Sequence, residues 1–345
     1  MMRVATLCSM AFALLSSPLD AQGTRPVRDD VGFTWDAQQM GRLIDYLNEG
    51  ETAPPPPSNI VAAIAPHDDY LYAARVYYPL YRVLRAREVV IFGVTHGGVR
   101  QAMGNPHDIV ILDNFEDWTG LGHTVGISPL REYVKAHLGS SDFIVSDEAQ
   151  ALEHSIEAEI PFLQYYNPDV QITPIMVTQM PFERMNEVTD RLSKVIADYI
   201  EENHLVPGRD IAFLVSSDAD HYGEDFNNSP YGEDARAHEE ATANDRRIAH
   251  AHLEGVLSSE RMQGFIGEMD SVVWCGRYAI PFGLLTSEKI VHRLSGGQLE
   301  GRVLRYSDTY TESVLPLRGT GMGTTAPASY KHWCGWLSAA YYIAR

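Results

Sequence analysis

Histidine and aspartate residues follow three separate apolar runs of the chain. These residues are His67 after 60–65, His96 after 89–94, and Asp218 with His221 after 211–216. Imidazole nitrogens combined with a carboxylate or a thiolate are ligands that suit iron, copper or zinc. A metal held by such ligands with one coordination position open would be catalytic. The spacing therefore predicts a metal site built from residues that are far apart in the sequence.

Cys275 is the candidate for a sulfur ligand. It stands between Trp274 and Gly276, where the glycine permits close approach of the backbone. We expect Arg277 to help hold the sulfur as a thiolate. Two other interpretations stay open: a small buried apolar side chain, or a disulfide with Cys334.

The segment Glu153–Glu157 offers residues that could orient metal ligands. His154 and Glu157 are three positions apart, so they share a helix face if Ser155 begins a helix. Such a pair would hydrogen-bond to the ligands and hold them in place. The alternative is the capped start of a helix at the surface.

Strands that alternate with helices must position these residues. Helical spacing of apolar residues predicts helices over 73–84 and 184–202. Buried or β-branched runs predict strands at 60–65, 89–94, 109–112, 170–177, 211–216, 302–306 and 336–343. This alternation predicts an α/β fold, a three-layer sandwich with a central, mostly parallel sheet. Ligands of such sheets bind beyond the carboxyl ends of the strands, where the polar residues lie.

Composition and the first residues define the organisation of the chain. Residues 1–21 have the basic, apolar and small-residue regions of a secretory signal, which predicts export to the periplasm or the medium. Residues 22–58 are expected to be a polar, proline-rich lead-in, and 59–345 a single domain. The 345 residues carry a net charge of −19, which argues against a nucleic-acid partner, and no run is long enough for stable membrane insertion. The expected partner is a small-molecule substrate or a short peptide.

Five motifs of this chain resemble those of the Memo family, whose bacterial and archaeal members are called AmmeMemoRadiSam system protein B. In order, they are P-H-x-x-Y at 66–70, G-x-x-H-x-G at 93–98, E-H-S-I-E at 153–157, S-S-D-x-x-H at 216–221 and C-G-R at 275–277. The family is similar in fold to the class III extradiol dioxygenases of the LigB type. The resemblance therefore implies a LigB-like α/β sandwich over the region from Ile60 to the C-terminus.

The resemblance also implies roles for individual residues. His67, His96 and Cys275 match the metal-site residues of the family, and His221 matches the acid/base histidine of the dioxygenases, with Asp218 expected to orient it. The residues expected around the metal or the substrate are Tyr70, His154, Glu157, Arg277 and Asp69.

The chain departs from the family pattern beside His67. Asp68 and Asp69 stand where the family usually has Ala-Gly. These carboxylates could shift the site toward a harder metal, or they could pair with Arg75 or Arg100 and take no part in the chemistry.

Three functions compete at this point. The first is dioxygenase-like redox chemistry at a mononuclear site, with iron(II) as the expected metal and copper or zinc as alternatives. The second is zinc-dependent hydrolysis, because His-Asp-Asp after the first strand is similar to the A-H-P-D-D motif of zinc-dependent N-deacetylases. The third is a binding protein that retains the pocket without catalysis.

Overall fold

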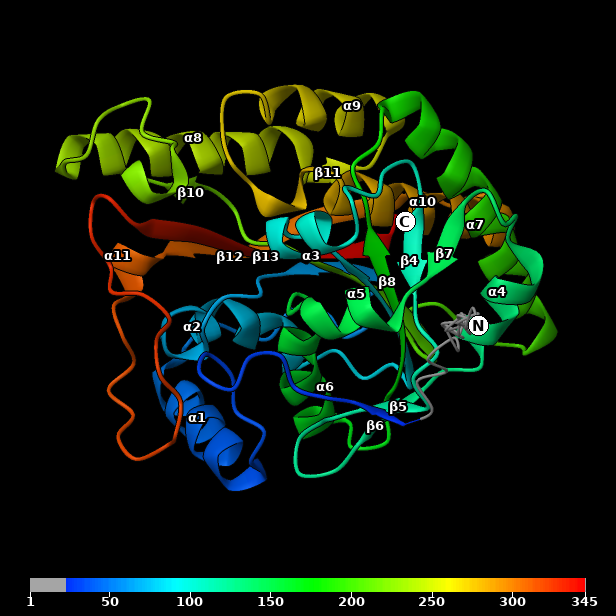
Figure 1. The fold of residues 1–345 in the computed structure, drawn as a ribbon, viewed down its shortest axis with the longest axis horizontal. Coiled ribbons are helices and arrows are strands. Elements are labelled where there is room, and N and C mark those ends of the chain that lie inside the picture. The colour runs from blue at the N-terminus through cyan, green and yellow to red at the C-terminus, as the bar shows by residue number, and fades with distance from the viewer. Residues whose placement is uncertain (1–22, 345) are drawn as a thin grey trace, which may run out of the picture.

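A central sheet organises the molecule, here a computed structural model in which residues 23–344 are described (Figure 1). The strands are β1 (Thr24–Arg25), β2 (Ala62–Ala65), β3 (Glu88–Gly93), β4 (Val110–Leu112), β5 (Asp117–Trp118), β6 (Val125–Ile127), β7 (Phe143–Val145), β8 (Gln171–Val177), β9 (Ile211–Ser216), β10 (His221–Tyr222), β11 (Gly255–Val256), β12 (Leu299–Asp308) and β13 (Trp333–Ile343). The seven strands expected from the sequence are all present, several with shifted ends.

The order of the sheet is β1-β5-β6-β8-β3-β9-β2-β13-β12-β11. Its centre is parallel, since β8, β3, β9 and β2 pair in parallel with their neighbours in this run. β13 then pairs antiparallel with both β2 and β12. The sheet is therefore mixed, with a parallel centre whose strands all end at the same edge.

Helices cover both faces of this sheet, which gives three layers, as expected (Figure 1). Helices α1, α2, α5 and α6 lie on one face, and α4, α7, α8, α9 and α10 lie on the other. The helices are α1 (Ala37–Gly50), α2 (Tyr70–Tyr81), α3 (Gly97–Ala102), α4 (Leu130–His137), α5 (Asp147–Leu152), α6 (Ile160–Tyr166), α7 (Phe182–Glu202), α8 (Ala235–His252), α9 (Ser259–Glu268), α10 (Ala279–Ser295) and α11 (Thr309–Glu312), with 3-10 turns η1 (Glu157–Glu159), η2 (Glu224–Phe226) and η3 (Cys275–Arg277).

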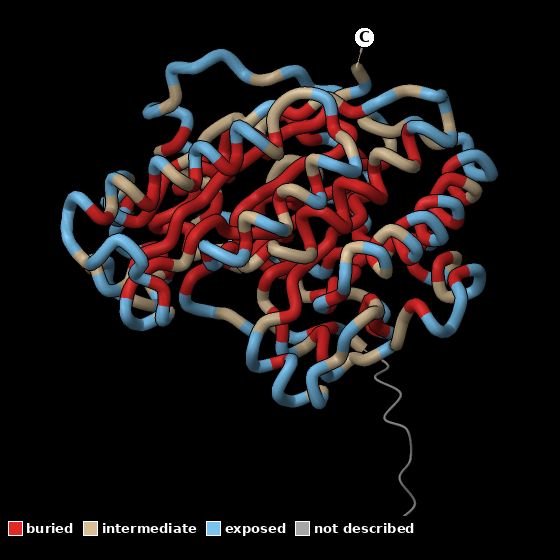
Figure 2. The backbone as a smooth tube through the Cα atoms, turned by 90° about the horizontal axis from the view of Figure 1, so that it is seen from above, coloured by how far each residue is buried: buried red, intermediate tan, exposed pale blue. Residues whose placement is uncertain are grey.

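Two apolar cores form because side chains of a strand alternate between its faces. In β3, Val89 and Ile91 pack into the core under α1 and α2. Their neighbours Val90 and Phe92 pack into the opposite core under α7 and α10. Figure 2 shows the consequence, with buried backbone concentrated in the centre and exposed residues on the outer turns. Because the central strands are buried on both faces, they form a rigid base for the residues that follow their carboxyl ends.

The expected lead-in 22–58 contains a helix that the sequence analysis did not predict. The Asp36 side chain caps α1 by accepting hydrogen bonds from the backbone N–H groups of Gln38 and Gln39. The helix buries Met40 and Leu43, among others, against the core of the domain. This part of 22–58 is therefore integral to the fold. The expected signal segment, 1–21, lies outside the described residues.

None of the helices described between residues 23 and 344 combines the length and the apolar character needed to cross a membrane.

Candidate metal centre

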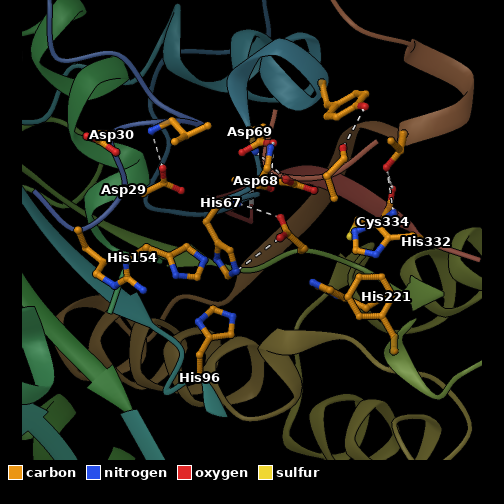
Figure 3. Close-up of a pocket in the computed structure, with 18 residues that line it drawn as sticks. Asp29, Asp30, His67, Asp68, Asp69, His96, His154, His221, His332 and Cys334 are labelled. Carbon is orange, nitrogen blue, oxygen red and sulfur yellow. Dashed lines mark hydrogen bonds and ion pairs between the residues drawn. The ribbon is translucent and has the colours of Figure 1, made fainter. Parts of the chain in front are cut away.

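His67 and His96 lie close together at the carboxyl ends of β2 and β3 (Figure 3). The ring centroids are 5.1 Å apart and the rings are nearly perpendicular. Both strands pair in parallel with β9, so Asp218, which follows β9, arrives at the same edge. The prediction that separate strand ends bring these residues together is confirmed.

Ser216 sets the tautomer of His67. Its hydroxyl donates to the Ser155 carbonyl oxygen at 2.7 Å, which uses its only proton. The same hydroxyl oxygen therefore accepts a hydrogen bond from Nδ1 of His67, 2.8 Å away. Burial, together with the nearby His96 and His154, lowers the pKa of His67 well below its ordinary value. The ring is thus neutral, and its Nε2 carries a lone pair, as a metal ligand requires.

Glu153 orients His96 in a comparable way. The Nδ1 atom of His96 lies 2.7 Å from Glu153 Oε1, and the His96 backbone N–H donates to Oε2. Burial alone would raise the pKa of the Glu153 carboxyl, but the adjacent His96 and its hydrogen bonds hold that pKa well below the usual range. Because an ionised carboxylate only accepts hydrogen bonds, Nδ1 of His96 is the donor, and Nε2 is the ring nitrogen left for a metal.

Glu153 was not predicted from the sequence. Within the same motif, the spacing of three positions favoured His154 and Glu157 instead. The available signal was that a glutamate directly precedes a histidine in a motif already linked to the site. The sequence did not indicate where the Glu153 side chain points, because η1 starts only at Glu157 and the residues before it form no regular helix or strand.

Cys275 closes the other side of His67. Its Sγ lies 3.4 Å from Nε2 of His67 and accepts a hydrogen bond from the Asp218 backbone N–H at 3.1 Å. A Cβ atom on Gly276 would lie 2.0 Å from the Ser217 hydroxyl oxygen, so the expected need for glycine is confirmed. Burial, and then the charge of Asp218, raises the pKa of the Cys275 thiol well above its ordinary value.

Arg277 does not hold the sulfur as we expected. Its guanidinium donates to the Met269 carbonyl oxygen and to the Asp270 carboxylate. The side chain is drawn away by this ion pair, so no hydrogen bond joins Arg277 to Cys275. The disulfide alternative is not formed either, since Cys275 and Cys334 are both free.

The atoms that could hold a metal ion form two overlapping groups. Within each group these atoms lie within 4.8 Å of one another, and the groups are His67/His96/His154 and His67/Asp218/Cys275. The expected ligands are therefore shared between two groups that meet at His67. His154, expected only to orient ligands, is itself close enough to be one. Its ring stacks on His96 at 4.6 Å, but its Nδ1 is 3.7 Å from Glu153, too far for a hydrogen bond.

Asp218 does not orient His221, contrary to expectation. One oxygen of Asp218 accepts a hydrogen bond from the His67 backbone N–H at 2.9 Å, and the other lies 3.5 Å from Nε2 of His67. His221 is instead oriented by the Ala219 carbonyl oxygen, 3.2 Å from its Nδ1. Burial lowers the pKa of His221, so its ring is neutral with Nε2 free to accept a proton.

Tyr70 and Glu157 lie away from the metal ligands. Tyr70 is fully buried in the core, where it packs against Phe162 and donates to the Ala158 carbonyl oxygen. Glu157 forms a buried ion pair with Arg25 and accepts backbone hydrogen bonds from residues 28 and 29. It shares no helix face with His154. Its role is to hold the N-terminal segment 25–31 beside the site.

Two cavities meet at the histidines. The larger, about 690 Å³, contains His67, Asp69 and His154 in its wall (Figure 3), and the smaller, about 430 Å³, contains Cys275 and Arg277. Asp69 accepts hydrogen bonds from Thr325, and burial, with the charge of Asp68, raises its pKa to about 7. Of the two alternatives for Asp68 and Asp69, pairing with Arg75 or Arg100 does not occur: Arg75 pairs with Glu312, and Arg100 donates to the Thr95 carbonyl oxygen.

Comparison with known proteins gives a consistent family. A family model described as "Memo-like protein" matches residues 33–315. A "MEMO1 family protein" of Desulfurococcus amylolyticus is 27% identical over 304 residues, which cover 85% of this chain and 89% of that protein. One from Pyrococcus furiosus is 29% identical, covering 74% of this chain and 82% of that protein. One from Methanosarcina barkeri is 32% identical over a shorter stretch, 48% of this chain and 56% of that protein.

Proposed function

Because the chain belongs to the family of Memo-like proteins, we propose that it binds one metal ion through His67, His96 and Cys275 and uses it in redox chemistry on a small molecule or short peptide. One observation carries this proposal. Both histidines have Nδ1 occupied by a hydrogen bond to a buried partner, which leaves Nε2 as the ring nitrogen available to a metal in each. His154 lacks such a bond, which favours His67 and His96 as the two fixed ligands.

The donor set fits a transition metal. Two neutral imidazoles and one sulfur favour iron, copper or zinc over magnesium or calcium, which prefer oxygen ligands. Cys275 must lose its proton when it binds the metal, and the Asp218 backbone N–H is already placed to stabilise a sulfur anion. We propose iron(II) as the metal, with copper and zinc as the alternatives that the measurement must distinguish.

Protein groups around the ligands supply the rest of the chemistry. When bound, iron(II) would provide redox chemistry with dioxygen and an electrophilic centre for the substrate. His221 lines both cavities, and its Nε2 is free to take a proton from a substrate hydroxyl. Asp218, hydrogen-bonded to the backbone of His67, holds the first ligand in place. The proposal also includes export after cleavage before Gln22, which mass spectrometry of the mature N-terminus would test.

The test is an anaerobic metal titration of the full chain. We expect wild type to bind about one iron(II) per chain and His67→Ala and Cys275→Ser to lose most of that affinity, because each variant removes one of three donors. His250→Ala is the matched control, since His250 is an exposed histidine on α8 that pairs with Glu254. Circular dichroism and thermal unfolding would show that the variants remain folded.

The outcomes separate the competing functions. Unchanged iron stoichiometry in both site variants would refute the proposed ligands. Loss of binding in His154→Gln but not in Cys275→Ser would assign the metal to the three histidines instead. Zinc-dependent amide hydrolysis without oxygen consumption would replace the redox proposal with the hydrolase.

A further inference from the structure

The two cavities beside the metal centre share part of their walls but differ in charge. His96, His221 and Phe226 line both cavities. The larger cavity carries Asp29, Asp30 and Asp68 in its wall in addition to Asp69 and Asp218. The smaller one carries Arg100 and Arg277, and no aspartate or glutamate is among the described residues that line it. A ligand at the histidines thus has an acidic cavity on one side and a basic cavity on the other.

Three carboxylates of the larger cavity, those of Asp29, Asp30 and Asp68, have no cationic partner among the described residues. Among residues 23–344, no arginine, lysine or histidine lies within 4.0 Å of the carboxylate of Asp29, Asp30 or Asp68. Asp29 Oδ1 accepts hydrogen bonds from the backbone N–H groups of residues 31 and 32, and Asp68 accepts one from Trp336. Neutral donors therefore hold two of these carboxylates in place and leave their charge uncompensated. Arg28 is the one arginine among the described residues of this wall.

The arginines of the smaller cavity are also incompletely used. Arg100 donates to the Thr95 carbonyl oxygen and forms no ion pair with any described carboxylate. Arg277 pairs with Asp270 through one terminal nitrogen, while its buried Nε has no hydrogen-bond partner among the described residues. Guanidinium groups with free N–H donors are suited to bind a carboxylate.

The geometry points to a zwitterionic substrate that spans the metal centre, with its cationic group in the larger cavity and its carboxylate in the smaller. An ω-amino acid and a short peptide with free termini both have this chemistry, since their opposite charges lie at opposite ends. This inference rests on the proposed function in one respect, namely that the site is catalytic and the bound zwitterion is its substrate. The charge pattern itself does not depend on a metal.

The test measures binding of a defined series of probes to the full chain by calorimetry, with and without iron(II) under anaerobic conditions. The probes are ω-amino acids with five to eleven methylene groups and triglycine, each compared with its N-acetyl and its carboxamide derivative. We expect at least one zwitterion to bind about tenfold or more tightly than either blocked derivative, because each derivative loses a charge-assisted contact. Equal affinity for zwitterion and blocked derivatives, or no binding by any probe, would overturn the inference.

Variants assign each charge to its cavity. In Arg100→Gln the preference for the carboxylate over the carboxamide should fall about tenfold, while the preference for the free amine persists. Asp29→Asn combined with Asp30→Asn should do the reverse, and asparagine at 29 keeps the oxygen that accepts the backbone hydrogen bonds. The controls are Arg209→Gln and Asp198→Asn, two exposed ion-pair residues outside the cavities. If both preferences survive in the cavity variants, the charges are read elsewhere and the inference is wrong.

The same preparations distinguish this inference from the proposed function. If iron(II) does not bind but the metal-free chain still prefers the zwitterion, the charge inference stands and the metal proposal fails. If iron(II) binds through His67 and Cys275 but no zwitterion is preferred, only the charge inference fails.

Discussion

The end of the larger cavity that holds the proposed metal ligands, here called the metal end, and the outer wall of that cavity are built in different ways. The metal end consists of buried residues that directly follow β2 and β9, such as His67 and Asp218, and lies within the region matched by the family model. The outer wall comes from residues 28–31 and 325–334, which lie outside that match. From this difference we infer that the residues at the sheet edge carry the reactive groups, while the peripheral segments determine which ligand binds.

The two regions are also held by different contacts. His67 has a hydrogen bond at Nδ1 and another at its backbone N–H, both to buried groups. The outer wall depends on a few long-range contacts, chiefly Glu157 to residues 25–29 and Asp69 to Thr325. Variants of single carboxylates should therefore separate the two regions.

The largest effect is expected from Glu157→Ala. This change leaves the Arg25 guanidinium buried without its carboxylate, which should lower the free energy of unfolding by about 3–5 kcal/mol. Chemical denaturation measures that loss. Hydrogen exchange should become faster at the backbone N–H groups of residues 28 and 29, which donate hydrogen bonds to the Glu157 carboxylate. Unchanged exchange there would mean that Glu157 does not hold the outer wall.

Glu153→Gln should act on the metal end instead. The carboxylate accepts from His96 Nδ1 and two backbone N–H groups through Oε1 and from the His96 backbone N–H through Oε2. An amide has only one accepting oxygen, so it cannot bind both the ring and the backbone of His96, and the orientation of His96 is weakened. We expect metal affinity to fall by about 10–100-fold. An anaerobic titration measures it, with Asp29→Asn as the outer-wall control that should retain wild-type metal affinity. Equal losses in both variants would contradict the division between the two regions.

Glu159→Gln should change how stability depends on pH, and the change within one pH unit is the smallest of the three effects. Burial raises the pKa of Glu159 to about 8, and the Tyr81 hydroxyl donates to its carboxyl. Between about pH 4.5 and 8 the unfolded chain ionises this group while the native chain keeps it protonated, so its contribution to stability falls as pH rises. The variant should remove up to about 1.4 kcal/mol per pH unit of that slope. Denaturation midpoints of both proteins across this pH range measure the slope. An identical slope in wild type and variant would contradict the prediction.

Local patterns were sufficient for the framework and for the ligands at strand ends. The continuous apolar run of β3 predicts a strand buried on both faces, and the apolar stripe of α7 predicts a helix with one buried face. Parallel strands end at one edge, so the meeting of His67 and His96 could be predicted without knowing any contact. Helix α1 escaped prediction because the proline run that follows it suggested a stiff, polar segment.

The sequence by itself determined the α/β framework, the family pattern and the edge of the sheet where the proposed metal ligands meet, because these depend on local sequence patterns and strand direction. Only the tertiary structure decided which charged neighbour each of them contacts. Glu153 rather than Glu157 reaches His96, and Glu157 instead pairs with Arg25, 132 positions away in the chain. These glutamates lie buried in or next to an irregular turn, and a buried charge is stable only when it is paired or hydrogen-bonded. The partner is therefore set by which distant segments pack against the turn.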